Sequence, residues 1–152
     1  MRRSKCLIPK KFLQQAFYLD QRINSKIEQI ATLNSLARKA TSTLSDMPKA
    51  PGRNTSRLED IIVKIVMLQE EINNDIDSLV DIKIRITEMI NDMEDKEQQM
   101  VLEKRYLNFS SFEQIAVDLN FSIQHVFRIH KQALSEIEPV IKEYEENKDE
   151  SK

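Results

Sequence analysis

The chain has 152 residues, enough for one domain or two small ones. Charged residues make up 32% of it and aromatic residues 6%, with one glycine and no tryptophan. That composition favours long helices over sheets, which need β-branched and aromatic residues and many turns. The formal net charge of −2 excludes a global basic field that would attract nucleic acid, so any DNA contact must come from a local patch.

Cysteine usage and hydropathy indicate the compartment. Cys6 is the only cysteine, so the chain forms no internal disulfide, which is typical of a reducing cytoplasm. No run of about 18 apolar residues is present, so we expect no membrane contact. Residues 1–11 carry five Lys or Arg side chains and no acid, but no apolar core of a secretory signal follows. We expect a flexible basic terminus there, with a phosphate-touching arm as the alternative.

Residues 12–44 contain neither Pro nor Gly and repeat apolar residues every seven positions. Pro9 suits the first turn of a helix, where its missing N–H is not needed. The pattern predicts an amphipathic helix with a coiled-coil-like stripe. The stripe has one row of Ala16, Ile23, Ile30, Ala37 and Leu44 and a neighbouring row of Phe12, Leu19 and Leu33. Residues 46–54 hold two prolines and the only glycine, so we expect the chain to reverse there.

A second and longer helix is predicted to begin at the capping box of Ser56 and Glu59. Because a lone helix of this kind leaves its stripe exposed, we expect residues 12–94 to fold as an antiparallel coiled-coil hairpin. The residues that we assign to the hairpin core and to oligomerisation are Leu58, Ile65, Ile72, Leu79 and Ile86.

The second seam of this helix is expected at Ile62, Gln69, Ile76, Lys83 and Ile90, while Asp75 interrupts a third row. Three rows are more than a two-stranded seam needs, which indicates a second copy of the hairpin alongside. Gln69 and Lys83 either set the register or lie at the edge of the stripe, and we favour the edge.

Residues 95–138 are predicted to form three short helices, of which the last two make a helix-turn-helix. Asp95 with Gln98, and Ser111 with Gln114, are capping boxes. No Pro or Gly enforces a break before Asp95, so a helix continuous with the preceding one stays open. The apolar positions are Val101, Leu102 and Tyr106 in the first helix, Ile115, Ala116 and Leu119 in the second, and Val126, Ile129 and Ala133 in the third.

The third helix is predicted to follow the turn Asn120-Phe121-Ser122, with Ser122 as its cap. Its polar face carries amide and cationic side chains, as a reader of the DNA major groove requires. This face comprises Gln124, His125, Arg128, Lys131 and Gln132. We expect the third helix to run on past Pro139. Residues 139–152 form an acidic tail whose polar end, residues 142–152, should fray into disorder.

Catalytic chemistry is absent from the sequence. One glycine excludes a Gly-rich phosphate loop. His125 and His130 are five residues apart, whereas metal-binding pairs on a helix are three or four apart. Cys6 reads as a free surface thiol. We therefore expect no enzyme activity, no metal and no cofactor, with His125 as a groove-facing donor and His130 at the surface or the core edge.

The segment from Arg105 to Leu134 resembles region 4 of bacterial sigma factors, the domain that reads the upstream promoter element. The shared pattern is Arg105-Tyr106, Ser111 through Ile115-Ala116, the turn ending in Ser122, and Ala133-Leu134. With its preceding hairpin, the chain resembles small phage and prophage proteins of Gram-positive bacteria similar to the ArpU and RinA type activators of late genes. The resemblance implies a cytoplasmic transcriptional regulator in a bacterial host cell.

The resemblance and the helix geometry together imply the DNA contacts. Gln124, His125 and Arg128 are expected at base edges, since Arg reads guanine and Gln reads adenine. Ser122, Lys131 and Gln132 are expected at phosphates.

Two residues depart from the sigma-factor pattern. Asn120 replaces a glycine, which it can do because Asn tolerates the left-handed conformation. Phe127 replaces a frequent arginine, which removes one expected DNA-binding side chain. Because the charge of the unit is also nearly balanced, affinity should depend on a dimer or on a partner such as RNA polymerase.

Two alternatives remain. One is a DNA-recognising packaging subunit like the small subunit of a terminase, although in that family the DNA module usually comes first. The other is a polymerase-docking adaptor that uses the sigma-like fold as a protein surface, without reading bases.

Overall fold

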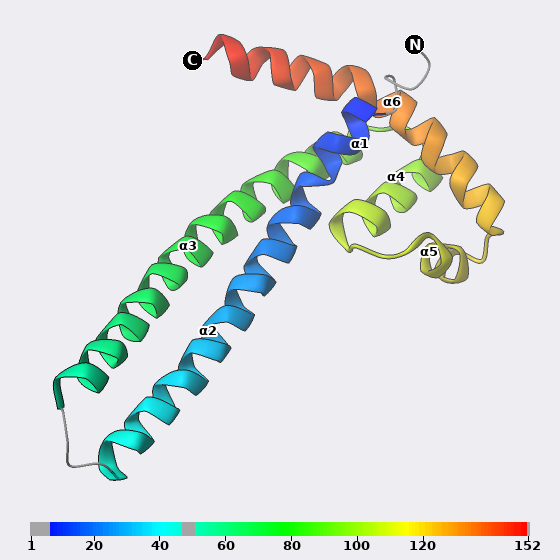
Figure 1. Ribbon diagram of the computed structural model, residues 1–152. Helices are drawn as coiled ribbons and strands as arrows, with labels where there is room; N and C mark the ends of the chain where they lie inside the picture. The colour runs from blue at the N-terminus through cyan, green and yellow to red at the C-terminus, as the bar shows by residue number, and fades with distance from the viewer. Residues whose placement is uncertain (1–6, 47–50, 152) are drawn as a thin grey trace. The chain divides into compact units, whose positions relative to one another are not determined.

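The structure is a computed structural model that describes residues 7–46 and 51–151, and every regular element in these ranges is a helix (Figure 1). The predicted all-α class is confirmed. The elements are α1 (Leu7–Leu13), α2 (Gln15–Asp46), α3 (Pro51–Asn91), α4 (Lys96–Leu102), the π-helix η1 (Glu103–Leu107), α5 (Phe112–Leu119) and α6 (Ile123–Glu150). They form two compact units, one of residues 19–78 and one that joins residues up to 18 with those from 79 onward.

The unit of residues 19–78 is an antiparallel hairpin of α2 and α3 (Figure 1). On α3, Ile72 is buried and Leu58 and Ile65 are half-buried. The second seam differs from the prediction, because Ile62, Gln69 and Ile76 are exposed. The row of Ile61, Leu68 and Asp75 lies inward instead.

A lysine explains why Asp75 belongs to the seam rather than interrupting it. Lys26 lies on the inward row of α2, and its Nζ is 2.5 Å from Asp75 Oδ2 and 3.4 Å from Glu71 Oε2. The hydrogen bond to Asp75 raises the pKa of Lys26. A charged pair inside an apolar seam is satisfied in only one alignment of the two helices, so it selects the register of the hairpin. Gln69 lies outside the seam, as we favoured.

Several element boundaries differ from the predicted ones. α1 begins at Leu7, inside the predicted basic terminus, and Pro9 is buried in its first turn. α3 begins at Pro51, inside the predicted loop, because proline is preorganised for the first helical position; Ser56 is therefore inside the helix. Residues 1–6, including Cys6, and residues 47–50 lie outside the described residues, as does the side chain of Leu44.

The chain breaks its helix before α4. α3 ends at Asn91, and Asp95 caps α4 by accepting hydrogen bonds from the backbone N–H groups of Glu97 and Gln98. Gln99 reinforces the corner, since its Nε2 donates to Met93 O at 2.5 Å. The predicted helix of residues 96–107 changes into a π-helix at Glu103.

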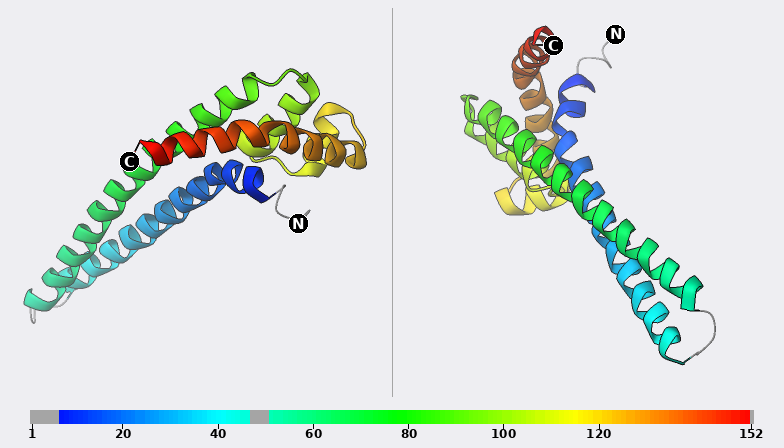
Figure 2. Two further views of the ribbon diagram at one scale, coloured as in Figure 1. Left: turned by 90° about the horizontal axis from the view of Figure 1, so that it is seen from above. Right: turned by 90° about the vertical axis from the view of Figure 1, so that its left-hand side faces the viewer.

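The core of the second unit includes residues on both sides of residue 94, where the sequence predicted a domain boundary. Phe12, Leu13, Ile86 and Ile90 are buried in one cluster with residues of α4, η1 and α6. Leu79 packs against the same cluster. α1 lies against α6 (Figure 2). The three-helix unit therefore depends on the first helix of the chain and on the end of α3.

α6 extends much further than predicted. Instead of fraying over the predicted residues 142–152, the helix continues to Glu150. Ile141 is fully buried and Tyr144 packs edge-on against Phe12 at 5.7 Å between ring centroids. Pro139 lies within the helix and is exposed, and Figure 1 shows α6 bending along its length, as expected where proline removes one backbone hydrogen bond.

Candidate nucleic-acid interface

The turn between α5 and α6 has the geometry that the sequence predicted. Asn120 adopts the left-handed conformation, with φ 57° and ψ 43°. Its N–H bonds to Val117 O at 3.3 Å, and the N–H of Phe121 bonds to Ala116 O at 2.9 Å. This pair of bonds is the Schellman arrangement, which satisfies the last carbonyls of a helix. The chain thus leaves α5 and enters α6 after three residues.

Both helices of the pair begin at serine caps. Ser111 Oγ accepts from the N–H of Gln114 at 3.1 Å, and Ser122 Oγ accepts from the N–H of His125 at 3.2 Å. These predicted caps are confirmed. The capping box at Ser111 is only half formed, because the Gln114 amide donates to Asp118 Oδ1 at 2.7 Å instead of turning back.

The inner faces of α5 and α6 pack on α4 around a small apolar cluster. Val101, Ile115 and Val126 are fully buried, with Ala116 and Ile129 beside them. Phe112, Leu119 and Phe121 cover the edge of this cluster. The packing holds the start of α6 in place and leaves its opposite face to solvent.

The exposed face of α6 collects the predicted contact residues. Gln124, Arg128, Lys131 and Gln132 are exposed at three- and four-residue spacing, so they form one stripe. Ser122 is exposed at the start of the helix. No acidic residue occurs between Ser122 and Ser135. This stripe combines amides, cations and a helix N-terminus, all of which bind acceptor groups and anions.

His125 differs from the rest of the set. Its ring packs edge-on against Phe121 at 4.8 Å, and its Nε2 lies 3.9 Å from Glu97 Oε2. The side chain is partly buried by these neighbours. The imidazole therefore lies at the rim of the stripe, where a carboxylate competes for it.

Phe127, which replaces an arginine of the sigma-factor pattern, has a packing role. It is 47% exposed, and its ring lies 5.0 Å from that of Phe112. Arg105 covers the other part of Phe112, with its guanidinium carbon 4.2 Å from the ring centroid, and donates to Ser110 O at 3.1 Å. Arg105, the arginine of the sigma-like pair, thus positions the start of α5.

Tyr106 and His130 form a buried polar pair that the sequence did not predict. His130 is only 8% exposed, so its expected place at the surface or core edge is wrong. The Tyr106 hydroxyl and His130 Nε2 share a hydrogen bond of 2.6 Å. Burial, with smaller contributions from the Lys10 and Arg105 charges, lowers the pKa of His130 to about 4. Burial raises the pKa of Tyr106 to about 12, so both groups are neutral near pH 7.

Phe109 is a second feature that sequence reasoning missed. It adopts a positive φ of 60° at the end of η1, which costs a non-glycine residue about 1–2 kcal/mol. The ring packs against Phe17 at 5.7 Å and lies 4.9 Å from Lys83 Nζ. These contacts offset the backbone strain and aim the loop that leads into α5.

The charge of the unit is nearly balanced outside the stripe. Residues 95–137 hold five Lys or Arg and six acidic residues. One pair joins η1 to α5, with Lys104 Nζ 3.3 Å from Asp118 Oδ2. Hydrogen bonds from Gln114 and then Lys104 lower the pKa of Asp118. The acid-free part of α6 therefore runs from its start to Ser135, and Glu136 ends it.

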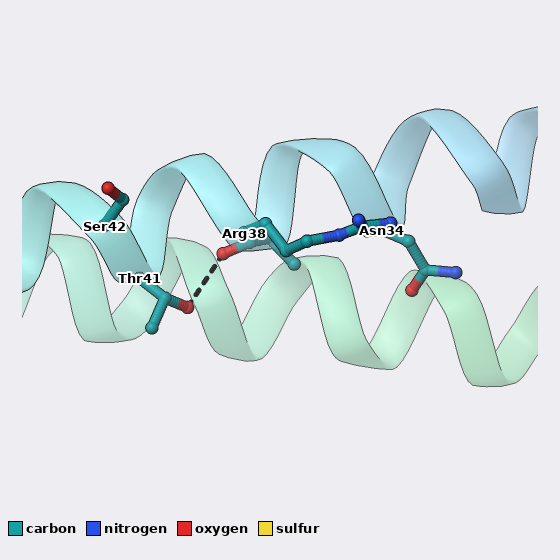
Figure 3. A pocket seen from close by; sticks show the side chains of 5 residues that line it. Asn34, Arg38, Thr41 and Ser42 are labelled. Atoms are coloured by element: carbon teal, nitrogen blue, oxygen red, sulfur yellow. Dashed lines mark hydrogen bonds between the residues drawn. The ribbon is translucent and has the colours of Figure 1, made fainter.

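No group of three or more metal-ligating side chains occurs among the described residues. A shallow depression on α2 is lined by Asn34, Ala37, Arg38, Thr41 and Ser42. In Figure 3 the Arg38 side chain extends along the helix toward Asn34, and Thr41 Oγ1 donates to Ala37 O at 2.8 Å. The depression holds amide, hydroxyl and guanidinium groups but no general base or thiol.

These features define an all-α protein with a helical hairpin and a helix-turn-helix whose second helix exposes a polar, acid-free stripe. The chain belongs to the family of proteins of unknown function DUF1492, whose profile matches residues 39–138. The match includes all of α3 and the helix-turn-helix. No curated protein and no solved structure matches the chain. Within residues 7–46 and 51–151, no helix is long and apolar enough to cross a membrane.

Proposed function

We propose that this protein is a sequence-specific DNA-binding regulator of phage or prophage transcription, similar to the ArpU and RinA type activators, that acts in the cytoplasm of a bacterial host. One observation carries the proposal: Gln124, Arg128 and Lys131 share one exposed, acid-free stripe at the start of a capped helix. A helix with this surface after a tight turn is the element that enters the DNA major groove in helix-turn-helix proteins.

The roles within the stripe follow from chemistry and position. Arg128 offers the bidentate donor pair that guanine accepts, and Gln124 matches the edge of adenine. Ser122, Lys131 and Gln132 bind phosphates and set the orientation of the helix. His125, held by Phe121 and Glu97, contributes at the rim.

The same surface implies that the protein does not work alone. The run from Ser122 to Ser135 carries two cations, Arg128 and Lys131. They can displace few counterions from DNA, so a single copy binds DNA weakly. A second copy or RNA polymerase would supply the missing affinity, as the resemblance to sigma region 4 implies.

The test is binding-site selection from random double-stranded DNA with the full chain. We expect wild type to enrich one motif and Arg128→Ala to lose preference at one base position, which corresponds to about 1–3 kcal/mol of discrimination. Arg128 is exposed, so its replacement should leave the Tm unchanged. Lys148→Ala, an exposed cation far along α6, is the matched control and should enrich the wild-type motif.

Lys131→Ala separates phosphate binding from base reading. It should weaken binding to every sequence and reduce the slope of log affinity against log salt by about 1. The proposal fails if wild type enriches no motif, or if Arg128→Ala enriches the same motif as wild type.

An adaptor that docks on RNA polymerase is the second candidate, favoured by the exposed Phe127 beside Arg128. Protein–protein interfaces are enriched in aromatic residues at their core. In that case Phe127→Ser would abolish capture of the polymerase, while Arg128→Glu and Lys131→Glu would leave it intact. If the protein binds DNA, Arg128→Glu and Lys131→Glu should lower DNA affinity more than Phe127→Ser does. Among the described residues, no feature favours a DNA-packaging subunit over these two functions.

A further inference from the structure

We infer that one face of the α2–α3 hairpin is a self-association surface that pairs with the same face of a second copy of this chain, about a two-fold axis that passes Gln69. The inference goes beyond the proposed function, because it concerns residues 19–78 and requires no DNA. It also gives a role to Ile62, Gln69 and Ile76, which the heptad pattern placed inside the hairpin and which the structure leaves exposed.

The surface, called here the uncharged face, is defined by nine residues that lie on one side of the hairpin. On α3 they follow at spacings of four and three, so they form one stripe, and the α2 residues follow the same spacing. In an antiparallel pair, the positions that flank the same side of the seam on both helices meet on one face of the hairpin. The residues are Asn24, Ile27, Ala31 and Asn34 of α2 and Ile62, Val66, Gln69, Asn73 and Ile76 of α3.

All nine residues are exposed and uncharged, and the two residues that continue the α2 stripe, Asp20 before Asn24 and Arg38 after Asn34, place charges at its ends. Ile27, Ile62, Val66 and Ile76 are 41–51% exposed, which is unusual for large apolar side chains gathered together. The opposite face of the hairpin does carry charges, among them Arg22, Lys64 and Glu71. This contrast marks the uncharged face as one that another apolar surface covers.

The order of residues on α3 identifies the occupant. Ile62 and Ile76 lie seven residues on either side of Gln69. When two α3 helices pack antiparallel about Gln69, each Ile62 meets the partner's Ile76. The two Gln69 amides then face each other, and each can donate and accept, so the pair satisfies itself. The stripe matches its own reverse at Ile62, Gln69 and Ile76, as a two-fold interface needs, and Val66 then lies opposite the partner's Asn73.

The α2 side of the face agrees with this axis. Lys26 pairs with Asp75 across the hairpin, which places these two residues at the same level. Because the helices are antiparallel, six residues further along α2 and six residues back along α3 place residue 32 level with Gln69. Ala31 lies at that level, and its small side chain allows two α2 helices to approach. The product is a four-helix bundle in which neighbouring helices are antiparallel, an arrangement common among soluble proteins.

The size of the face sets the strength of the pairing. Fourteen residues of α3 at 1.5 Å each, across two helices of 10 Å, give a projected area of about 400 Å². Stable complexes bury about 800 Å² per partner. We therefore expect a dimer that dissociates on dilution.

The experiment is light scattering and sedimentation velocity on the full chain over a wide range of concentration. Wild type should change from a one-chain mass to a two-chain mass as concentration rises. Ile62→Glu places a carboxylate in the interface twice and should remain at the one-chain mass. The matched control is Val63→Glu, because Val63 is equally apolar and 57% exposed but points away from the uncharged face; it should dimerise like wild type.

Disulfide capture gives a measurement that does not depend on tolerance of a glutamate. In a Cys6→Ser background, Gln69→Cys should form a disulfide-linked dimer on oxidation, since facing Cα atoms at a two-fold axis come within the required distance. Glu70→Cys, one residue further round the helix, should not. A one-chain mass at every concentration, a larger assembly than two chains, monomeric Val63→Glu, or equal cross-linking at both cysteines would overturn the inference. None of these outcomes bears on DNA binding.

Discussion

Acidification from pH 7 to pH 5 should destabilise the unit that contains the helix-turn-helix through one imidazole, that of His130. The side chain is buried, it shares a hydrogen bond of 2.6 Å with Tyr106, and the charges of Lys10 on α1 and Arg105 on η1 act against its protonation. Its pKa is about 4 in the folded state, against an ordinary value of 6.5. The unfolded chain therefore binds a proton at a higher pH than the folded chain does.

The sign and size follow from this difference. Because the pKa of His130 is depressed in the folded state, the full stability of the unit is present above pH 6.5. Part of that stability is lost as the pH falls toward 4, because the unfolded chain takes up the proton first. One pKa unit corresponds to about 1.4 kcal/mol, so the loss amounts to about 2 kcal/mol at pH 5 and about 3 kcal/mol below pH 4. This is a large share of the 5–15 kcal/mol that typically stabilises a domain.

The assay is urea unfolding of wild type and His130→Gln, followed by far-ultraviolet circular dichroism at pH 7 and pH 5 and at one protein concentration. Carboxylates titrate in both proteins, so the comparison isolates the imidazole. Wild type should lose about 2 kcal/mol more than the variant between the two pH values. Equal losses would refute the reasoning. An NMR titration of the His130 ring, assigned with His125→Gln, measures the same pKa directly, and a midpoint near 6.5 would also refute it.

Three further predictions concern the turn, the cap and the hairpin. Asn120→Val should lower the free energy of unfolding by about 1–2 kcal/mol because a β-branched residue is disfavoured at φ 57°, whereas Asn120→Gly should keep it; thermal melts that rank the two variants equally would contradict this. Ser122→Ala should cost about 1 kcal/mol because the helix loses its cap, measured by urea unfolding, and an unchanged midpoint would show that the cap adds nothing. Asp75→Ala should lower the Tm more than the exposed Asp77→Ala does, because it removes the nearer partner of Lys26 and leaves only the exposed Glu71 beside it. Lys26→Met combined with Asp75→Leu should recover that stability, and a double variant less stable than both single ones would rule out a register-setting pair.

Most of the local structure follows from the sequence alone. Helix caps at Asp95, Ser111 and Ser122 and the left-handed Asn120 are encoded within four residues of each site, because the bonds they make are that short in sequence. The seven-residue period placed α2 and α3 in the same way, since a row of apolar residues on one face needs no knowledge of its partner. The exposed stripe of α6 could be predicted for the same reason.

Pairing between distant residues was decided only by the tertiary structure. The sequence showed Asp75 as an interruption of the stripe because its partner Lys26 is 49 residues away. Their contact places the row of Ile61, Leu68 and Asp75 inside the hairpin. His130 was expected at the surface or the core edge because the sequence does not show that the rings of Tyr106 and Phe112 pack against it. Residues 142–150 appeared to be a solvated, frayed tail, yet Tyr144 packs against the core that contains Phe12 and Ile141. Helices form from neighbours in sequence, but the side of a helix that is covered depends on surfaces that periodicity does not describe.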